Sequence, residues 1–191
     1  MTVIDLPFIS FGNPEQFSMW LEKNHQSSQG IWIQFFKKHS GITAITYDEA
    51  LDVALCYGWI DSQVKRYDAV SYIQKFTPRR AKSIWSKVNT QHALRLIQDG
   101  RMQQAGLEQV ETAKRDGRWD RAYSPAGEII LPEDFIEALK KNKDAEKFFQ
   151  TLNKTNIYTI YWRLQTAKKP ETRTRRMAVI LTMLANRKAF H

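Results

Sequence analysis

The sequence has little of several features that would identify a protein class. Cys56 is the only cysteine among 191 residues, so no disulfide can form within the chain. No apolar run approaches the roughly 20 residues that span a bilayer. The first ten residues contain Asp5 and Pro7 and lack the basic start of a secretory signal. We therefore expect a reduced, cytoplasmic protein without a membrane span.

The sequence motifs of common catalytic sites are also absent. The four histidines stand far apart, and none has another His or Cys at metal-ligand spacing. There is no phosphate-binding loop, dinucleotide-binding glycine pattern or nucleophilic serine turn. We expect neither a metal nor a cofactor. Cys56 lies near the end of a predicted helix, one turn after Asp52. Both features disfavour a thiolate, so we interpret Cys56 as a packed structural residue.

What the sequence does contain is a net charge of +9, distributed unevenly along the chain. Residues 1–60 carry −3, residues 61–100 carry +5, residues 101–150 carry −1 and residues 151–191 carry +8. Solubility alone does not require two concentrated basic blocks. Their presence predicts one or two local sites for an anionic partner.

Periodicity and capping signals predict an α+β fold for the first part of the chain. Helix starts are indicated at Asn13 and Thr46, and the apolar run 50–57 predicts a helix through the core that ends at Gly58. Strands are expected at 31–36, 63–67 and 70–76, and further helices at 83–88, 89–98 and 102–114. These elements predict a small three-stranded sheet packed with helices.

An all-helical C-terminal module is expected to follow. We predict an α+β domain at 1–118, a linker at 119–131 that contains Ser124-Pro125-Ala126-Gly127, and the helical module at 132–191. Helices are expected to start at Pro132, to be capped by Asp144, to cover 155–168 and to start again at Pro170. The last two carry apolar stripes of Ile157, Ile160, Tyr161 and Leu164, and of Met177, Ile180, Leu181 and Leu184, which we interpret as packing surfaces.

The first basic block contains Arg79, Arg80 and Trp85 within Phe76–Ser86. Arginine binds phosphate or carboxylate groups through two parallel hydrogen bonds, and a tryptophan ring can stack on a guanidinium. The block is therefore a candidate anion site. In the alternative interpretation, the two arginines pair with the protein's own Asp48, Glu49 or Asp61.

The second basic block surrounds Pro170, where a helix is expected to begin. Five cations crowd this region, against the single acidic Glu171: Lys168, Lys169, Arg173, Arg175 and Arg176. Cations at a helix N-terminus cost stability unless an anion is supplied. Arg173 is in line with the apolar stripe and is the candidate for an internal salt bridge. The other four cations are candidates for an external partner.

Four blocks resemble the YdeI/OmpD-associated, or bacteriocin-protection, family: EALDVALCYGWIDSQ, FTPRRAKSIWS, GRMQQAGLEQVETAKRDGRW and LQTAKKPETRTRR, at residues 49–63, 76–86, 100–119 and 164–176. The blocks occur in this order, and the resemblance runs over most of the chain. The resemblance implies an uncharacterised bacterial protein without known catalytic residues, linked by name to a porin and to antimicrobial-peptide tolerance. The positions that match family motifs are Trp59, Asp61, Arg79, Arg80, Trp85, Lys168, Lys169 and Arg173.

Two physical points narrow these implications. A chain without an export signal would not meet a porin directly, and a protein of net charge +9 repels cationic peptides. The first hypothesis is therefore an accessory or stress-tolerance protein that binds an anionic small molecule or an acidic partner surface. The second is an enzyme for a phosphorylated or carboxylated substrate, with Asp61 as base in a pocket with Trp59 and Trp85. The third, less favoured because the last helix lacks a row of base-reading side chains, is nucleic-acid binding.

Overall fold

The computed structural model describes residues 6–124 and 129–191, which form two compact units. The first comprises the described residues up to Trp85 together with Asn89–Ala122, and the second comprises Ser86–Val88 and the described part of Tyr123–His191. Residues 1–5 and residues 125–128 of the predicted linker lie outside this description. The second unit is discontinuous in sequence. Ser86 pairs with Tyr123 in an isolated parallel bridge, and Lys87 N donates to Tyr123 O at 2.8 Å.

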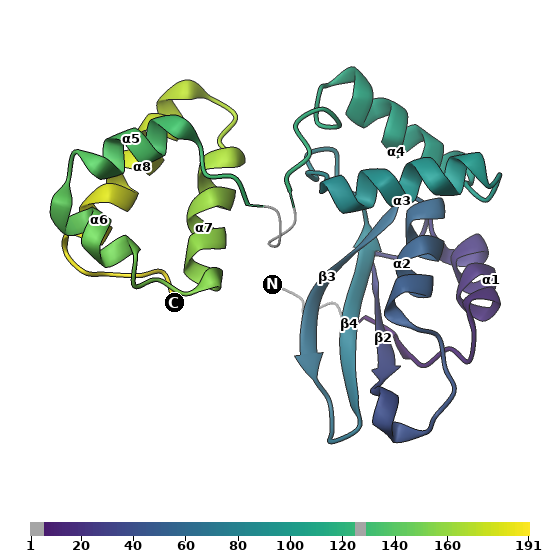
Figure 1. Ribbon diagram of the computed structural model, residues 1–191. Coiled ribbons are helices and arrows are strands. Elements are labelled where there is room, and N and C mark those ends of the chain that lie inside the picture. The colour runs from purple at the N-terminus through teal and green to yellow at the C-terminus, as the bar shows by residue number, and fades with distance from the viewer. Residues whose placement is uncertain (1–5, 125–128) are drawn as a thin grey trace. The chain divides into compact units, whose positions relative to one another are not determined.

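The first unit contains a four-stranded sheet (Figure 1). Its order is β1-β2-β4-β3, with β1 at Phe8–Ile9, β2 at Ile31–Phe36, β3 at Trp59–Arg66 and β4 at Ser71–Pro78. β1 runs parallel to β2, and the other pairs are antiparallel. The prediction of three strands was wrong because β1 is too short to show an alternating pattern. β3 begins earlier than predicted, and an irregularity between Asp61 and Val64 breaks its register with β4.

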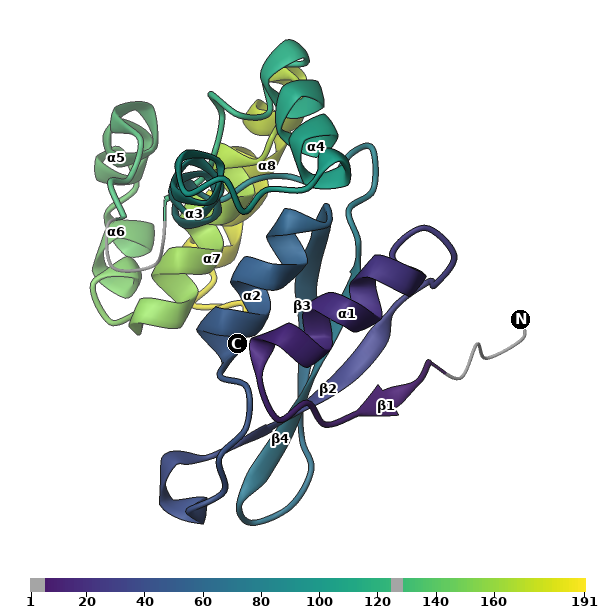
Figure 2. The same ribbon diagram turned by 90° about the vertical axis from the view of Figure 1, so that its right-hand side faces the viewer.

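Helices α1 (Pro14–Asn24) and α2 (Tyr47–Cys56) cover one face of this sheet, as Figure 2 shows, and the 3₁₀ helix η1 spans Lys38–Ser40. The predicted starts are confirmed. The Asn13 side chain accepts from Gln16 N, and Thr46 and Glu49 form a reciprocal capping box. Every residue of 50–56 is buried. Because α2 has no exposed side over these residues, its side chains contribute to two separate hydrophobic cores.

The second of these cores lies between α2, α3 (Lys87–Gln98) and α4 (Gln104–Arg115). A Cβ atom on Gly106 of α4 would lie 2.3 Å from Cys56 O, so the two backbones are in direct contact. The helix predicted at 83–88 is wrong: the chain there is irregular until α3 begins. The carbonyls of Ser83 and Ile84 accept hydrogen bonds from the side chains of Arg118 and Arg79, and not from the backbone N–H groups of a helix.

The second unit contains α5 (Glu133–Lys140), α6 (Lys143–Phe149), α7 (Lys154–Gln165) and α8 (Pro170–Ala185). Ile160, Leu164, Ile180 and Leu184 are buried in its core, which confirms the two apolar stripes as packing surfaces. The start of α6 is capped by Asn142, whose Oδ1 accepts from Ala145 N at 3.1 Å, and not by Asp144 as predicted. Among the residues described, no helix has the length and hydrophobicity to cross a membrane.

Candidate functional site

Arg79 follows directly after β4 and is buried, with 7% of its surface exposed. Its guanidinium carbon lies 3.6 Å from the ring centre of Trp85, and Nη1 donates to Ile84 O at 3.3 Å. Its backbone N donates to Gly58 O at 3.0 Å, beside the start of β3. The segment between Arg79 and Trp85 therefore folds back so that the tryptophan covers the arginine.

A second buried arginine, Arg118, belongs to the same cluster. Its Nε donates to both carboxylate oxygens of Asp116, at 2.8 and 2.7 Å, and Nη1 donates to Ser83 O at 2.8 Å. Trp119 packs against Trp85 with ring centres 5.1 Å apart. No sequence pattern predicts this role for Arg118. A basic residue in a turn after a helix is common, and nothing in its sequence neighbours indicates burial.

Two buried donors of this cluster have no acceptor among the described residues: Nη2 of Arg118 and Nε1 of Trp85. The two side chains are only 5% and 2% exposed. A buried donor without an acceptor costs about 1–3 kcal/mol, so native proteins satisfy such groups with water or a ligand. Arg80, by contrast, points into solvent, and its backbone N donates to Ser83 Oγ at 3.0 Å.

Asp61 lies on β3 and is held by two neutral groups. Its Oδ2 accepts from Tyr47 OH at 3.1 Å and from Gln74 Nε2 at 2.8 Å. Burial raises the pKa of Asp61 above its usual value, although both hydrogen bonds and the charge of Arg79 act in the opposite direction. Trp59, two residues earlier, is a core residue whose Nε1 donates to His25 O at 3.2 Å.

In the second unit, the five cations at the start of α8 divide into two groups. Arg173 forms the predicted internal ion pair, a bidentate contact with the carboxylate of Asp134 in α5. Arg176 is also used internally: its Nη1 donates to Arg163 O at 2.7 Å, which satisfies a carbonyl near the end of α7. Lys168, Lys169 and Arg175 are exposed, and none of them contacts an acidic group in the described part of the chain. Arg79 and Arg80 thus belong to one unit and these cations to the other.

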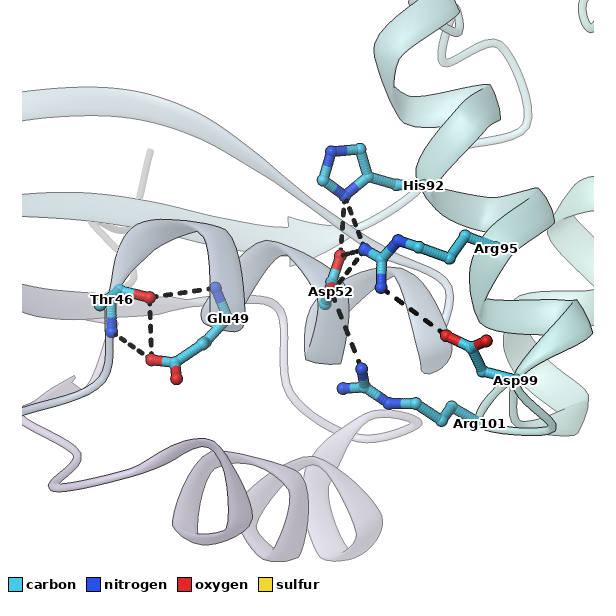
Figure 3. Close-up of polar contacts among 7 residues, drawn as sticks. All are labelled: Thr46, Glu49, Asp52, His92, Arg95, Asp99 and Arg101. Carbon is cyan, nitrogen blue, oxygen red and sulfur yellow. Dashed lines mark hydrogen bonds and ion pairs between the residues drawn. The ribbon is translucent and has the colours of Figure 1, made fainter.

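Asp52 is the centre of an ion network that the sequence did not indicate (Figure 3). This buried carboxylate contacts Arg95 Nη2 and His92 Nδ1 at 2.7 Å, and Arg101 Nη1 at 3.8 Å. Burial alone would raise the pKa of Asp52, but the hydrogen bonds of Arg95 and His92 outweigh it and lower the pKa. The partners come from α3 and the connection after it, 40 or more residues away, so no local pattern marks them.

Cys56 ends α2 and is 5% exposed. Burial raises the pKa of its thiol to about 11, with Asp52 adding a smaller effect of the same sign. The side chain is therefore a thiol at neutral pH. This confirms the interpretation as a packed residue, although burial contributes more than the helix end and the carboxylate that suggested it.

Two family models match the chain. A domain of unknown function, DUF8412, matches residues 9–109, and "Bacteriocin-protection, YdeI or OmpD-Associated" matches residues 128–187. The second match contains block 164–176 of the resemblance, whereas blocks 49–63 and 76–86 fall within the first. The YdeI/OmpD-associated relationship thus covers less of the chain than expected. No curated protein and no solved structure matches the chain.

Proposed function

The chain belongs to the DUF8412 family through residues 9–109, carries a YdeI/OmpD-associated domain at residues 128–187, and we propose that it is a cytoplasmic accessory protein that binds an anionic ligand. The observation that carries this proposal is the pair of buried donors on Arg118 and Trp85 without an acceptor in the described chain.

An anion suits these donors better than a neutral group. Arg118 shares its Nε and Nη1 with Asp116 and Ser83, and one face of the Trp85 ring already carries the Arg79 guanidinium. A phosphate or carboxylate oxygen would give Arg118 Nη2 a charge-assisted hydrogen bond, which is about twice as strong as a neutral one. The site therefore offers one N–H group of the buried Arg118 guanidinium and the indole N–H of Trp85 to an acceptor.

The direct test is titration with inorganic phosphate and with acetate, observed on the indole N–H resonance of Trp85. Trp85→Phe identifies this resonance by its loss and removes one donor while it retains a ring. Arg118→Lys should weaken binding at least about tenfold, because one charge-assisted hydrogen bond is worth 1.5–3 kcal/mol. Arg80→Lys is the matched control at an exposed arginine and should bind normally.

A control titration with potassium chloride at the same ionic strength distinguishes specific anion binding from general charge screening. If potassium chloride shifts the Trp85 resonance as much as phosphate and acetate do, or if neither anion shifts it, the site does not bind anions. A shift with phosphate alone identifies a phosphorylated ligand. A shift with acetate alone identifies a carboxylated ligand.

The exposed cations of the second unit support a separate partner, an acidic surface. Lys168, Lys169 and Arg175 lie at the start of α8, and Lys169 at its N-cap makes no side-chain capping bond. The domain name refers to bacteriocin protection. Because a protein of net charge +9 repels cationic peptides, we propose that any such protection acts indirectly, through an anionic cell component.

The enzyme hypothesis has one observation in its favour, the raised pKa of Asp61. A general base works best when its pKa lies close to the working pH, and burial shifts the pKa of Asp61 in that direction. Asp61→Asn distinguishes this role, because it would abolish turnover of a phosphorylated or carboxylated substrate and leave anion binding at Arg118 intact. Nucleic-acid binding requires a steep loss of affinity with salt.

A further inference from the structure

A cavity of about 290 Å³ lies in the first unit and uses none of the residues of the anion site. Residues from α1, from the end of α2 and from the connection between α3 and α4 line it: Pro14, Glu15, Ser18, Val53, Cys56, Tyr57, Arg101 and Gln103. Because about ten water volumes fill such a space, the cavity can hold a small organic molecule.

Backbone contacts fix the walls of this cavity. Gln103 N donates to Cys56 O at 3.1 Å, and Arg101 N donates to Leu96 O at 3.0 Å. Gly106, one turn into α4, touches the backbone at the end of α2. The connection that presents Arg101 and Gln103 is therefore held against α2 before any ligand arrives, which lowers the entropy cost of binding.

The lining carries one charge of each sign, with neutral groups beside them. Glu15 comes from the first turn of α1 and is exposed, and Arg101 comes from the connection after α3. Ser18 Oγ and Tyr57 OH lie 3.2 Å apart and form a hydroxyl pair. Val53 and Cys56 supply buried apolar surface.

The Arg101 guanidinium is available to a ligand because Asp52 is already satisfied by closer partners. Figure 3 shows Arg101 reaching back toward α2, where its Nη1 lies 3.8 Å from Asp52. Arg95 and His92 contact the same carboxylate at 2.7 Å. Arg101 could therefore turn to a ligand carboxylate without leaving a buried charge unpaired.

We propose that this cavity binds a small zwitterion, an α-amino acid or a dipeptide. Its ammonium group pairs with Glu15, its carboxylate pairs with Arg101, and its apolar side chain lies against Val53 and Cys56. The site does not depend on the anion site around Arg118, so either can fail while the other stands.

The test uses four probes, L-leucine, L-methionine, L-phenylalanine and alanyl-leucine, added to the ¹⁵N-labelled full chain. The backbone amide resonances of Ser18, Tyr57 and Gln103 should shift with at least one of them. Leucine methyl ester lacks the carboxylate and N-acetyl-leucine lacks the ammonium group. Each should bind at least about tenfold more weakly than leucine, because each loses one charged contact.

Matched variants locate the two contacts. Arg101→Gln should raise the Kd at least about tenfold for the zwitterion but leave the Kd of the methyl ester unchanged. Arg115→Gln, which removes an exposed arginine outside the cavity, should bind as wild type does. Glu15→Gln should weaken binding, and Glu22→Gln on the same helix should not. The proposal is overturned if none of the four probes shifts these resonances, or if Arg101→Gln and Glu15→Gln both bind with the wild-type Kd.

Discussion

The guanidinium carbon of Arg79 lies 3.6 Å from the ring centre of Trp85, and both side chains are buried. An arginine that the sequence presents as a candidate for ligand binding is therefore stacked inside the fold. Arg79 organises the segment that ends at Trp85. Arg118, which the sequence did not indicate, and Trp85 each supply a buried donor with no acceptor in the described chain.

Asp52→Asn should destabilise the protein by about 2 kcal/mol at pH 7, because the charge-assisted hydrogen bonds of Arg95 and His92 are lost. The folded-state pKa of Asp52 is lowered, so its contribution is complete above the unfolded value near 3.9 and is lost as the pH falls through the folded value. Urea unfolding of both proteins from pH 7 to pH 3 measures the difference. A gap that stays constant below pH 4 would contradict the network.

Asp61→Asn should show the opposite pH dependence. The folded-state pKa of Asp61 is raised, so the wild type gains stability as the pH falls from 7 toward 4, when the folded carboxyl binds its proton first. Asparagine can accept from Tyr47 and Gln74 without a charge. The variant should therefore be no less stable than wild type at pH 7 in urea unfolding. A marked loss there would show that the carboxylate charge stabilises the fold.

Gly106→Ala should cost about 1–3 kcal/mol, because its new Cβ would lie 2.3 Å from Cys56 O and α4 would have to move away from α2. Gly12→Ala is the control, since a Cβ there meets only the flexible Gln16 side chain at 3.4 Å. Thermal unfolding of the two variants provides the comparison. Equal midpoints would mean that α4 does not contact α2 so closely.

The cations of α8 should separate into structural and exposed residues. Arg176→Ala removes the hydrogen bond to Arg163 O and should destabilise the protein by about 1 kcal/mol. Arg173→Ala should cost less than about 1 kcal/mol, because its ion pair with Asp134 is largely exposed.

Arg175→Glu should leave the free energy of unfolding unchanged and weaken binding of an acidic partner. Destabilisation by Arg175→Glu would show that the side chain has a structural role.

Alkylation of Cys56 by iodoacetamide should be slow at pH 8 and accelerate about tenfold per pH unit up to pH 10, because only the thiolate reacts and the thiol pKa is about 11. The urea-unfolded chain provides the reference, with an ordinary thiol. A rate that is already half maximal near pH 8 in the folded protein would identify a reactive cysteine and contradict the structural interpretation.

Local patterns predicted the local parts of the fold. The caps at Asn13 and Thr46 and the apolar stripes of α7 and α8 are properties of neighbouring residues, and the structure confirms them. β1 was missed because two residues carry no periodicity. The helix predicted at 83–88 fails because tertiary contacts take up its carbonyls.

The same distinction applies to the site residues: contacts set by local sequence could be predicted, and contacts between distant segments could not. Arg173 could be assigned to an internal ion pair because its position on the helix relative to the apolar stripe is fixed by sequence. Arg118 and the partners of Asp52 could not be found, since each depends on contacts between segments 35 or more residues apart. Burial also could not be inferred for Arg79, because it stands in a basic stretch with Arg80 and Lys82.

The bridge between Ser86 and Tyr123 has a consequence for how such chains can recombine. The second unit includes Ser86–Val88, a segment at and just before the start of α3 that is separated in sequence from the rest of the unit. A crossover at residue 123 would give Tyr123 a foreign pairing partner. Exchange of C-terminal halves between homologous genes should therefore preserve folding best when Ser86–Val88 are inherited together with the half that they pair with.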